Sequence, residues 1–233
     1  MKYLKATFLG MFLLLAFYLS AVLLWANAVA GELLKQTPSF HQAIQIQPRH
    51  VAALAIVEDP AFFEHRGLNI SNGQGLTTLT SVVARDLFLG NSDVDGISGA
   101  AQSFYRGVFD CCKRIDLGRD VMALVLDAHA TKQQQLNMYL NRTYFGSLNG
   151  KAVIGFDAAA NAYYGKDLSK LTDAEFFGLM AMPIAPNRYH PGRNPELHAE
   201  RARRIAALVA GECEARGWLD LSYEDCSAGE GTR

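Results

Sequence analysis

The sequence predicts an all-α protein, in which one N-terminal membrane-spanning helix precedes a helical domain. Three observations support this prediction. Alternating apolar and polar residues, which are typical of half-buried strands, are nearly absent from the chain. Helix-start signals are frequent, including two pairs with capping-box spacing, Thr131 with Gln134 and Thr172 with Glu175. Residues 6–31 contain no charged side chain, and a bilayer is crossed by about 20 apolar residues.

The N-terminal segment also predicts on which side of a membrane the rest of the chain lies. Lys2 and Lys5 precede the uncharged stretch, so the amino end should stay in the cytoplasm and the body should lie outside it. Ala28-Val29-Ala30 resembles a signal-peptidase site, so a cleaved signal peptide competes with a retained anchor. We favour the anchor because the apolar stretch is longer than an ordinary signal-peptide core. Either interpretation exports the domain.

The composition fits one globular domain with an appendage. The chain has 233 residues, of which 50% are hydrophobic, and its net charge of -1 gives no argument for a nucleic-acid partner. No serine has a lysine three residues later, so the Ser-x-x-Lys motif of a transpeptidase is missing. We expect an anchor at residues 1–31, a connector at 32–48, the domain at 49–211 and a C-terminal tail at 212–233.

Local signals place the helices of the domain in order. The apolar run Val51 to Val57 should form a buried helix, which Pro60 ends just after Glu58. Further helices are marked by Thr131 before the segment that holds Tyr139, by Gly165 after an alanine-rich segment, by Thr172 before Asp173 to Met182, and by Asn194-Pro195 before a segment that reaches about Val209. Residues 89–112, with glycines at positions 90, 96, 99 and 107, are the least helix-like part of the domain.

The four cysteines fit an oxidising compartment. Cys213 and Cys226 could bridge the C-terminal tail onto the last long helix. The neighbours Cys111 and Cys112 are poorly placed to pair with each other, and we interpret them as a buried or membrane-facing apolar pair. No cysteine has the spacing of a metal site.

Glu58 is the candidate catalytic residue. It lies at the C-terminal end of an apolar helix, where low dielectric and the negative end of the helix dipole both disfavour a carboxylate. Its pKa should therefore rise, which suits a general base near neutral pH. The alternative is that Glu58 and Asp59 only terminate a helix in solvent.

Five ordered stretches, from about residue 47 to 210, share the motifs of one known family. They are Glu58-Asp59 with Phe62, His65 and Gly67; Gly75 to Thr80 with Arg85-Asp86-Leu87-Phe88; Arg119 to Asp127; Lys132 to Gly146; and Gly155 to Pro195. The chain thereby resembles the peptidoglycan glycosyltransferases, the transglycosylases found alone or fused to penicillin-binding transpeptidase domains. Within this family, it resembles a divergent monofunctional member without a penicillin-binding domain.

This resemblance implies a fold, a reaction and a location. The fold would be a lysozyme-like helical lobe with a smaller lobe near the membrane. The reaction would join lipid-linked disaccharide units into glycan strands and release polyprenyl pyrophosphate. The domain would lie on the extracytoplasmic side of a bacterial inner membrane, with other cell-wall synthesis proteins as candidate partners. Residues 89–112 would then be either a membrane-embedded lip, with Phe104, Tyr105 and Phe109 dipping into the interface, or an idle surface insertion.

The resemblance also implies site residues. Glu58 matches the family's base. The candidate substrate-binding residues are Asp59, Phe62, His65, Gly75, Thr77, Thr78, Thr80, Arg85, Arg119, Asp120, Lys132 and Asn141. Arg85 and Lys132 stand at family lysine positions and would bind the pyrophosphate, with Mg²⁺ or Mn²⁺ as a candidate cofactor. The threonines could supply hydroxyls to sugar or phosphate or could cap a helix, while His65 and Asn141 also suit structural roles.

The departures from the family pattern put its activity in doubt. The family's second glutamate falls at Arg119, with Asp116 and Asp120 nearby, and its paired glutamines fall at Ser81 and Val82. Arginine could bind phosphate directly, Asp120 could take the glutamate's place, or polymerisation could be slow or lost. We therefore predict weakened or altered activity. The alternatives are a catalytically inactive scaffold that binds lipid-linked glycan and, with less support, a lysozyme-like glycan-cleaving enzyme.

Overall fold

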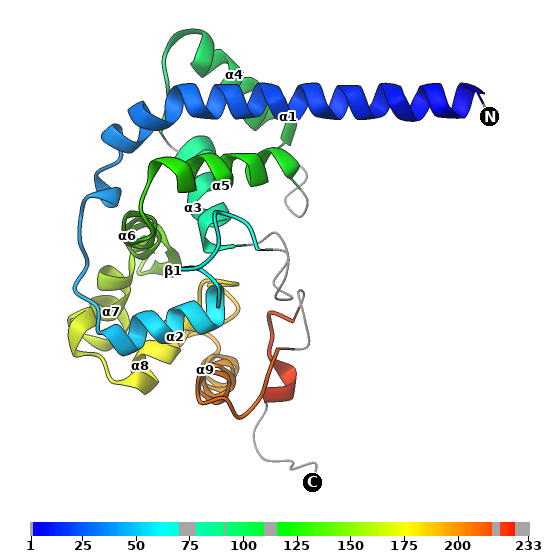
Figure 1. Cartoon of the computed structure of the whole chain (residues 1–233). Helices are drawn as coiled ribbons and strands as arrows, with labels where there is room; N and C mark the ends of the chain where they lie inside the picture. Colours follow the sequence, from blue (N-terminus) through cyan, green and yellow to red (C-terminus); the bar gives the residue numbers. More distant parts are fainter. Residues whose placement is uncertain (1, 70–77, 91, 110–115, 216–219, 227–233) are drawn as a thin grey trace.

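The computed structural model describes residues 2–69, 78–90, 92–109, 116–215 and 220–226 (Figure 1). Its helices are α1 (Lys2–Gln36), α2 (Pro48–Glu58), α3 (Leu79–Leu89), α4 (Gly96–Phe109), α5 (Leu117–His129), α6 (Lys132–Arg142), α7 (Phe156–Tyr164), α8 (Asp173–Met180) and α9 (Pro195–Val209), with short 3-10 turns at Pro38–Phe40, Leu168–Lys170 and Glu224–Cys226. The strands are β1 (Tyr144–Leu148) and β2 (Lys151–Ile154). The predicted helical fold is confirmed, with one hairpin added.

The hairpin follows from a turn signal that the helical prediction passed over. Asn149 and Gly150 both adopt positive φ, at 52° and 77°, as a two-residue type I′ turn requires. β1 and β2 pair antiparallel on either side of it, with Tyr144 opposite Ile154 and Leu148 opposite Lys151. The hairpin carries the chain from the end of α6 to the start of α7.

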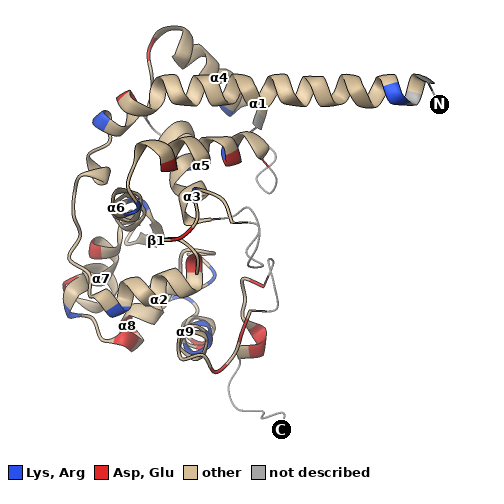
Figure 2. Ribbon diagram, in the orientation of Figure 1, with Lys and Arg blue, Asp and Glu red and all other residues tan. Residues whose placement is uncertain are grey.

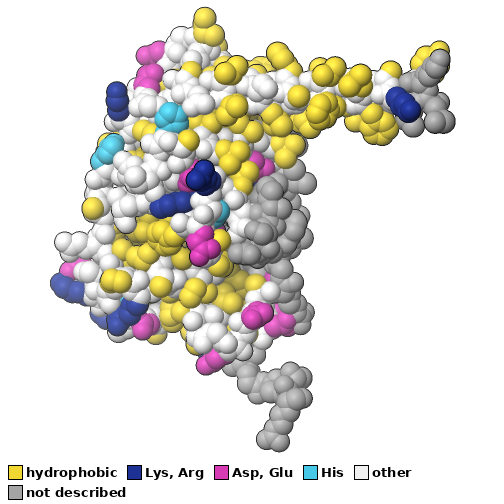
Figure 3. Space-filling model, viewed as in Figure 1, with side chains coloured by type: hydrophobic (Ala, Val, Ile, Leu, Met, Phe, Trp, Pro, Cys, Tyr) yellow, Lys and Arg dark blue, Asp and Glu magenta, His cyan; other side chains and the backbone are white. Residues whose placement is uncertain are grey.

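The long helix α1 has two different halves. It is the one helix among the described residues that is long and apolar enough to cross a membrane, with a mean hydropathy of 2.3. Its first half projects beyond the rest of the molecule with its apolar side chains exposed (Figure 3). Its charged side chains lie only near its two ends (Figure 2).

The second half of α1 belongs to the core of the domain. Val22, Ala26, Val29, Ala30 and Leu33 are buried and lie on one helix face, because they recur every three or four residues. This face packs mainly on α5 and also touches α3. The Trp25 indole N–H donates to the carbonyl of Ser98 at 3.0 Å, which fastens α4 to the same helix.

Residues 89–112 contain a helix, so the prediction that this stretch is the least helix-like part was wrong. α4 is amphipathic, but the apolar side chain of Phe104 faces outward while the polar side chain of Gln102 is buried. The Gln102 amide donates to the carbonyls of Phe88 and Ser92 at 2.8 and 2.9 Å, which ties α4 to the end of α3. Packing thus overrides the weak helix propensity of the glycines.

The side chains of this stretch face different ways. Phe104 is exposed, as a membrane-dipping residue would be, but Tyr105 is buried and donates to Asp116. The expectation that Tyr105 faces the interface was therefore wrong. The side chain of Phe109, and both Cys111 and Cys112, lie outside the described residues.

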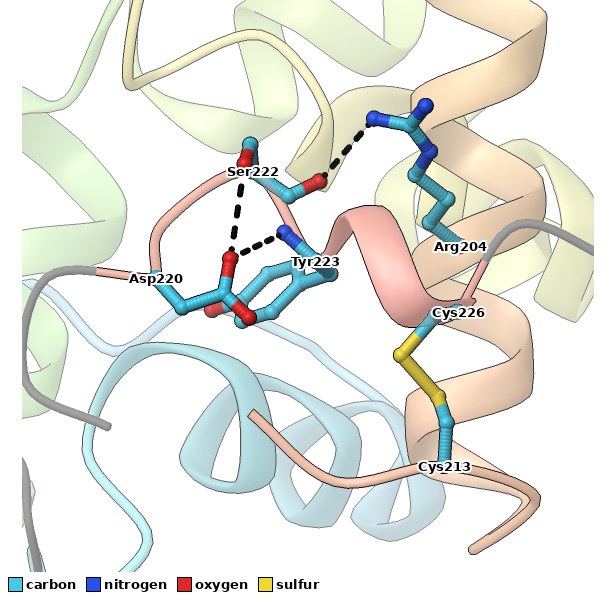
Figure 4. Close-up of a disulfide and its surroundings, with 6 residues drawn as sticks. All are labelled: Arg204, Cys213, Asp220, Ser222, Tyr223 and Cys226. Carbon is cyan, nitrogen blue, oxygen red and sulfur yellow. Dashed lines mark hydrogen bonds between the residues drawn. A yellow bond between two sulfur atoms is a disulfide. The ribbon is translucent and has the colours of Figure 1, made fainter. Parts of the chain in front are cut away.

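Helices α2, α8 and α9 form the part of the domain that lies away from α1 (Figure 1). His50 of α2 stacks on Phe176 of α8, with ring centroids 4.2 Å apart. Both predicted capping boxes, at Thr131 and Thr172, are present. The predicted disulfide between Cys213 and Cys226 is confirmed, and it folds the C-terminal tail back onto α9 (Figure 4).

Candidate active site

A cavity of ≈ 880 Å³ opens where α2 ends. Its walls come from α3, α6, the loop that follows α8, α9 and the C-terminal tail. The lining residues used below are Glu58, Thr78, Asp86, Tyr139, Arg142, Arg201, Asp220, Leu221 and Tyr223. Apolar side chains, including Ile56, Leu79 and Met138, form much of the remaining wall. Such a largely apolar pocket with a few converging polar groups is the usual form of a ligand site.

Glu58 is the last residue of α2, as the position of Pro60 predicts. Asp59 leaves the helix with a φ of -166° and a ψ of 83°, and Glu58 is left half-buried at the cavity wall. Burial raises the pKa of the Glu58 carboxyl above its ordinary value of 4.5. The Arg201 guanidinium and a hydrogen bond from Tyr139 oppose this rise in pKa, while the charge of Asp59 adds to it. The predicted helix-end carboxylate with raised pKa is therefore present.

Arg201 supplies the positive charge that faces Glu58. Its side chain is buried on the face of α9 that also carries the buried Ile205. The guanidinium donates to the carbonyls of Ala181 at 3.1 Å and Leu221 at 2.5 Å. It also lies 5.1 Å from the ring centre of Tyr189 and 5.5 Å from that of Tyr223, within the range of cation–π contact. A buried cation is thus held in a fixed position across from the carboxylate.

Asp59 and His65 form a polar network behind Glu58. Asp59 is fully buried, and its Oδ2 accepts from His65 Nε2 at 2.8 Å and from the backbone N–H of Leu79 at 2.9 Å. The N–H of Gly67 donates to His65 Nδ1 at 3.0 Å, so the proton of the neutral imidazole lies on Nε2. The Thr78 hydroxyl donates to the carbonyl of Gly67 and accepts from Ser81 N–H as the cap of α3. This network fixes the chain after Glu58 against the start of α3.

Gly67 has a position that only glycine fits. Its φ is 95°, and a Cβ there would come within 2.7 Å of the Ala123 carbonyl oxygen of α5. The glycine of the first motif therefore lets the chain pass close to this helix.

Thr80 and Lys132 meet in a second polar cluster. Lys132 Nζ lies 2.7 Å from Asp127 Oδ1 and 3.3 Å from the Thr80 hydroxyl oxygen. The same ammonium lies 4.8 Å from the ring centre of Phe62, which is buried. The Thr80 hydroxyl donates to Gln135 Oε1 at 2.7 Å. Because Asp127 already balances the charge of Lys132, a pyrophosphate at this position would compete with an existing ion pair.

Arg85 and Asn141 lie apart from the cavity lining. Arg85 is exposed on α3, whereas its neighbour Asp86 faces the cavity and forms an ion pair with Arg142 of α6. The Asn141 amide donates to three backbone carbonyls, those of Ser39, Gln42 and Asn137. Asn141 thus anchors the connector between α1 and α2.

Arg119 and Asp120 lie together in the first turn of α5, which Asp116 caps through the N–H of Arg119. Both side chains are buried, and within the described residues the Arg119 Nε and both Asp120 carboxyl oxygens have no hydrogen-bond partner. Burial raises the pKa of Asp120 to about 6, the charge of Arg119 opposes the rise, and Asp116 adds to it. Neither residue is among those that line the Glu58 cavity.

The structure thus brings part of the predicted set together. The cavity is lined by Glu58 and Thr78. Five further predicted residues lie behind this lining: Asp59, Phe62, His65, Thr80 and Lys132. Gly75 and Thr77 lie outside the described residues. Sequence reasoning gave no role to Tyr139, Arg142, Arg201 or Tyr223. The spacing of Tyr139 and Arg142, three apart on α6, is the one available signal that these two share a face.

Within the described part of the chain, no three His, Cys, Asp or Glu side chains gather into a group that could hold a metal ion. Asp86, a carboxylate at the cavity, is already paired with Arg142.

Comparisons with known proteins agree on one family. A family model described as Transglycosylase matches residues 27–210. Penicillin-binding protein 1A of Streptococcus oralis is 32% identical over 193 residues, which cover 76% of this chain and 26% of the relative. Penicillin-binding protein 1F of Bacillus subtilis is 31% identical over 160 residues (67% and 21%), and penicillin-binding protein 1B of Escherichia coli is 28% identical over 173 residues (68% and 18%). The chain spans about a quarter or less of the length of these relatives.

Proposed function

Because the chain belongs to the transglycosylase family, we propose that it is a membrane-anchored peptidoglycan glycosyltransferase. In the proposed reaction, a sugar hydroxyl of one lipid-linked disaccharide attacks the anomeric carbon of another. A glycosidic C–O bond forms, the bond from the anomeric carbon to the phosphate oxygen breaks, and polyprenyl pyrophosphate leaves. The hydroxyl proton passes to the Glu58 carboxylate.

The observation that carries this proposal is the position of Glu58. It is a half-buried carboxylate with a raised pKa at the wall of the cavity, with Tyr139 and Arg201 beside it. A base whose pKa lies nearer to the working pH accepts a proton more effectively than an ordinary exposed glutamate. Pyrophosphate is a good leaving group once its charge is countered, so one carboxylate can suffice.

We propose that this activity is weak on the usual cell-wall precursor or directed at another glycan. Arg119 stands where the family has its second glutamate, and an arginine cannot bind a metal ion as that residue would. Arg119 could contact phosphate directly, and Asp120 beside it has carboxyl oxygens without a hydrogen-bond partner among the described residues. A Mg²⁺ or Mn²⁺ ion would then be brought by the pyrophosphate, and no step of the proposal depends on it.

A second candidate is a scaffold that binds lipid-linked glycan without turning it over. The separation of Arg119 and Asp120 from the lining of the Glu58 cavity favours it. A Glu58→Gln variant separates the two functions in cells. An enzyme loses its cellular function with this change, whereas a scaffold keeps it.

Polymer formation tests the proposal. We expect purified full-length protein to convert labelled lipid-linked disaccharide into glycan polymer, more slowly than an ordinary family member does. Parallel samples with Mg²⁺, with Mn²⁺ and with a chelator show whether the pyrophosphate needs a cation. Polymer formed as fast as by an ordinary member would refute the weakened site, and binding without any polymer would favour the scaffold.

We also propose that α1 is retained as the anchor, with its amino end in the cytoplasm. Cleavage after Ala30 would remove Val22, Ala26, Val29 and Ala30, which are buried against the domain. With α1 retained in the membrane, α4, which contacts α1, would meet the lipid through its exposed side chains Ile97, Phe104 and Val108.

The intact mass of protein extracted from membranes checks this proposal. We expect a mass that includes residues 1–30, because most of the buried face of α1 lies there. A mature protein that begins at Gly31 would contradict the retained anchor.

A further inference from the structure

The C-terminal strap, defined as residues 211–215 and 220–226, forms one wall of the Glu58 cavity. Cys213, Glu214, Ala215, Asp220, Leu221 and Tyr223 contribute to the lining. The strap lies beyond residues 27–210, which the family model matches. This wall is therefore a feature of the present chain outside the matched domain.

Several contacts fasten the strap (Figure 4). The disulfide between Cys213 and Cys226 closes it on itself at the end of α9. Arg204 of α9 donates to the Ser222 carbonyl at 3.3 Å. The Asp220 carboxylate accepts from the backbone N–H of Tyr223 at 2.9 Å, which sets the turn that carries this tyrosine.

Tyr223 joins the strap to the helix that ends at Glu58. Its hydroxyl donates to the Val57 carbonyl at 2.9 Å, and its side chain is buried. Val57 directly precedes Glu58 in the last turn of α2, where carbonyls lack an intrahelical donor. The tyrosine supplies that donor, so the strap holds the turn that aims Glu58.

Arg201 provides a second link between the strap and Glu58. The Leu221 carbonyl of the strap accepts from the Arg201 guanidinium, which lies against the Tyr223 ring. The charge of the same guanidinium acts on Glu58. The strap thus fixes both the carboxylate and the cation that faces it.

We infer that the C-terminal strap positions Glu58 for glycosyl transfer and shields it from water, with Tyr223 as the positioning residue. This inference rests on the proposed function. Tyr223 is a positioning residue and not a catalytic one, because it acts on Glu58 through the backbone of α2 and through Arg201.

The strap should control the proton affinity of Glu58. The groups that face Glu58 are Asp59 of the α2 end, Tyr139 of α6, Arg201 of α9 and Tyr223 of the strap. The cavity also holds the Asp86–Arg142 pair, Glu214 and Asp220. Because burial is the largest cause of the raised pKa of Glu58, admitting water by loosening the strap should lower that pKa.

A carboxyl titration by ¹³C NMR on the full chain in detergent tests the inference without any substrate. The Glu58 signal is assigned by its loss in Glu58→Gln. We expect Tyr223→Phe, and more strongly Cys213→Ser/Cys226→Ser, to lower the pKa of Glu58. Tyr163→Phe is the matched control, because that hydroxyl donates to the Phe145 carbonyl at 2.8 Å and does not line the cavity. An unchanged Glu58 pKa in Tyr223→Phe, or an equal change in Tyr163→Phe, would overturn the inference.

Turnover provides the second readout. Loss of one hydrogen bond that positions Glu58 should slow polymer formation about fivefold in Tyr223→Phe, while Tyr163→Phe keeps the wild-type rate. Equal rates in the two variants would count against the positioning role. If the wild type makes no polymer, the proposed function fails, but the titration still decides whether the strap positions Glu58.

Discussion

Replacing Glu58 with glutamine is expected to slow glycosyl transfer by about 100- to 10,000-fold, the usual contribution of a general base. Glutamine has nearly the same shape but cannot accept the hydroxyl proton. The buried surroundings should keep the substrate in place, so binding of the lipid-linked saccharide should change little. Initial rates of polymer formation and a separate binding titration check both parts.

The same variant should not be less stable than the wild type. Burial raises the folded pKa of Glu58 above its unfolded value. The contribution of this group to the free energy of unfolding is therefore fully present only at a pH below the unfolded pKa. The contribution is lost as the pH rises through the folded pKa, where the buried charge becomes a cost. Glutamine carries no such charge, so the free energy of unfolding near neutral pH should stay equal or rise.

Glu64→Gln is the matched control for this prediction. Glu64 is an exposed glutamate six positions along the chain. We expect it to keep the wild-type rate. A similar loss of rate in both variants, or a Glu58→Gln enzyme that works as fast as the wild type, would remove Glu58 from the mechanism.

Replacing Asp59 with alanine is expected to lower the free energy of unfolding by about 2–6 kcal/mol, because two buried donors are left unsatisfied at about 1–3 kcal/mol each. The Asp59 carboxylate is fully buried and accepts from both His65 Nε2 and the N–H of Leu79. Alanine leaves these two donors buried without an acceptor, which costs more than the hydrogen bonds themselves contribute. Denaturant unfolding of the full chain in detergent measures the loss.

The variant Asp59→Asn tests whether the acceptor oxygen at position 59 is what stabilises the fold. Asparagine keeps one carbonyl oxygen at nearly the same place, so it should lose only about 1–2 kcal/mol. Equal losses in the alanine and asparagine variants would show that the hydrogen bonds are not what Asp59 contributes.

Local signals predicted the helices whose ends are set by single residues. Pro60 ends α2 at Glu58, and the capping boxes at Thr131 and Thr172 open α6 and α8 as expected. The helix α4 was missed because its glycines lower the local propensity, and its stability comes from packing and from the buried Gln102. The β-hairpin was missed although Asn149-Gly150 signals its turn.

The candidate site was predictable only in part, because its partners come from distant segments. The end of α2 indicated Glu58, but no local pattern shows that Arg201 and Tyr223 fold back onto it. Helix phase explains another difference. Neighbouring residues differ by about 100° around a helix, so Arg85 lies exposed on α3 while Asp86 reaches the cavity and pairs with Arg142.

The pH dependence of kcat/KM for polymer formation tests most directly whether Glu58 is the proton acceptor. The wild-type rate should fall on the acidic side at a pKa above 4.5, the ordinary value for glutamate, because burial raises that of Glu58. This acidic fall should be absent from the residual activity of Glu58→Gln. A wild-type rate that does not change with acidification, or the same acidic fall in Glu58→Gln, would contradict the assignment.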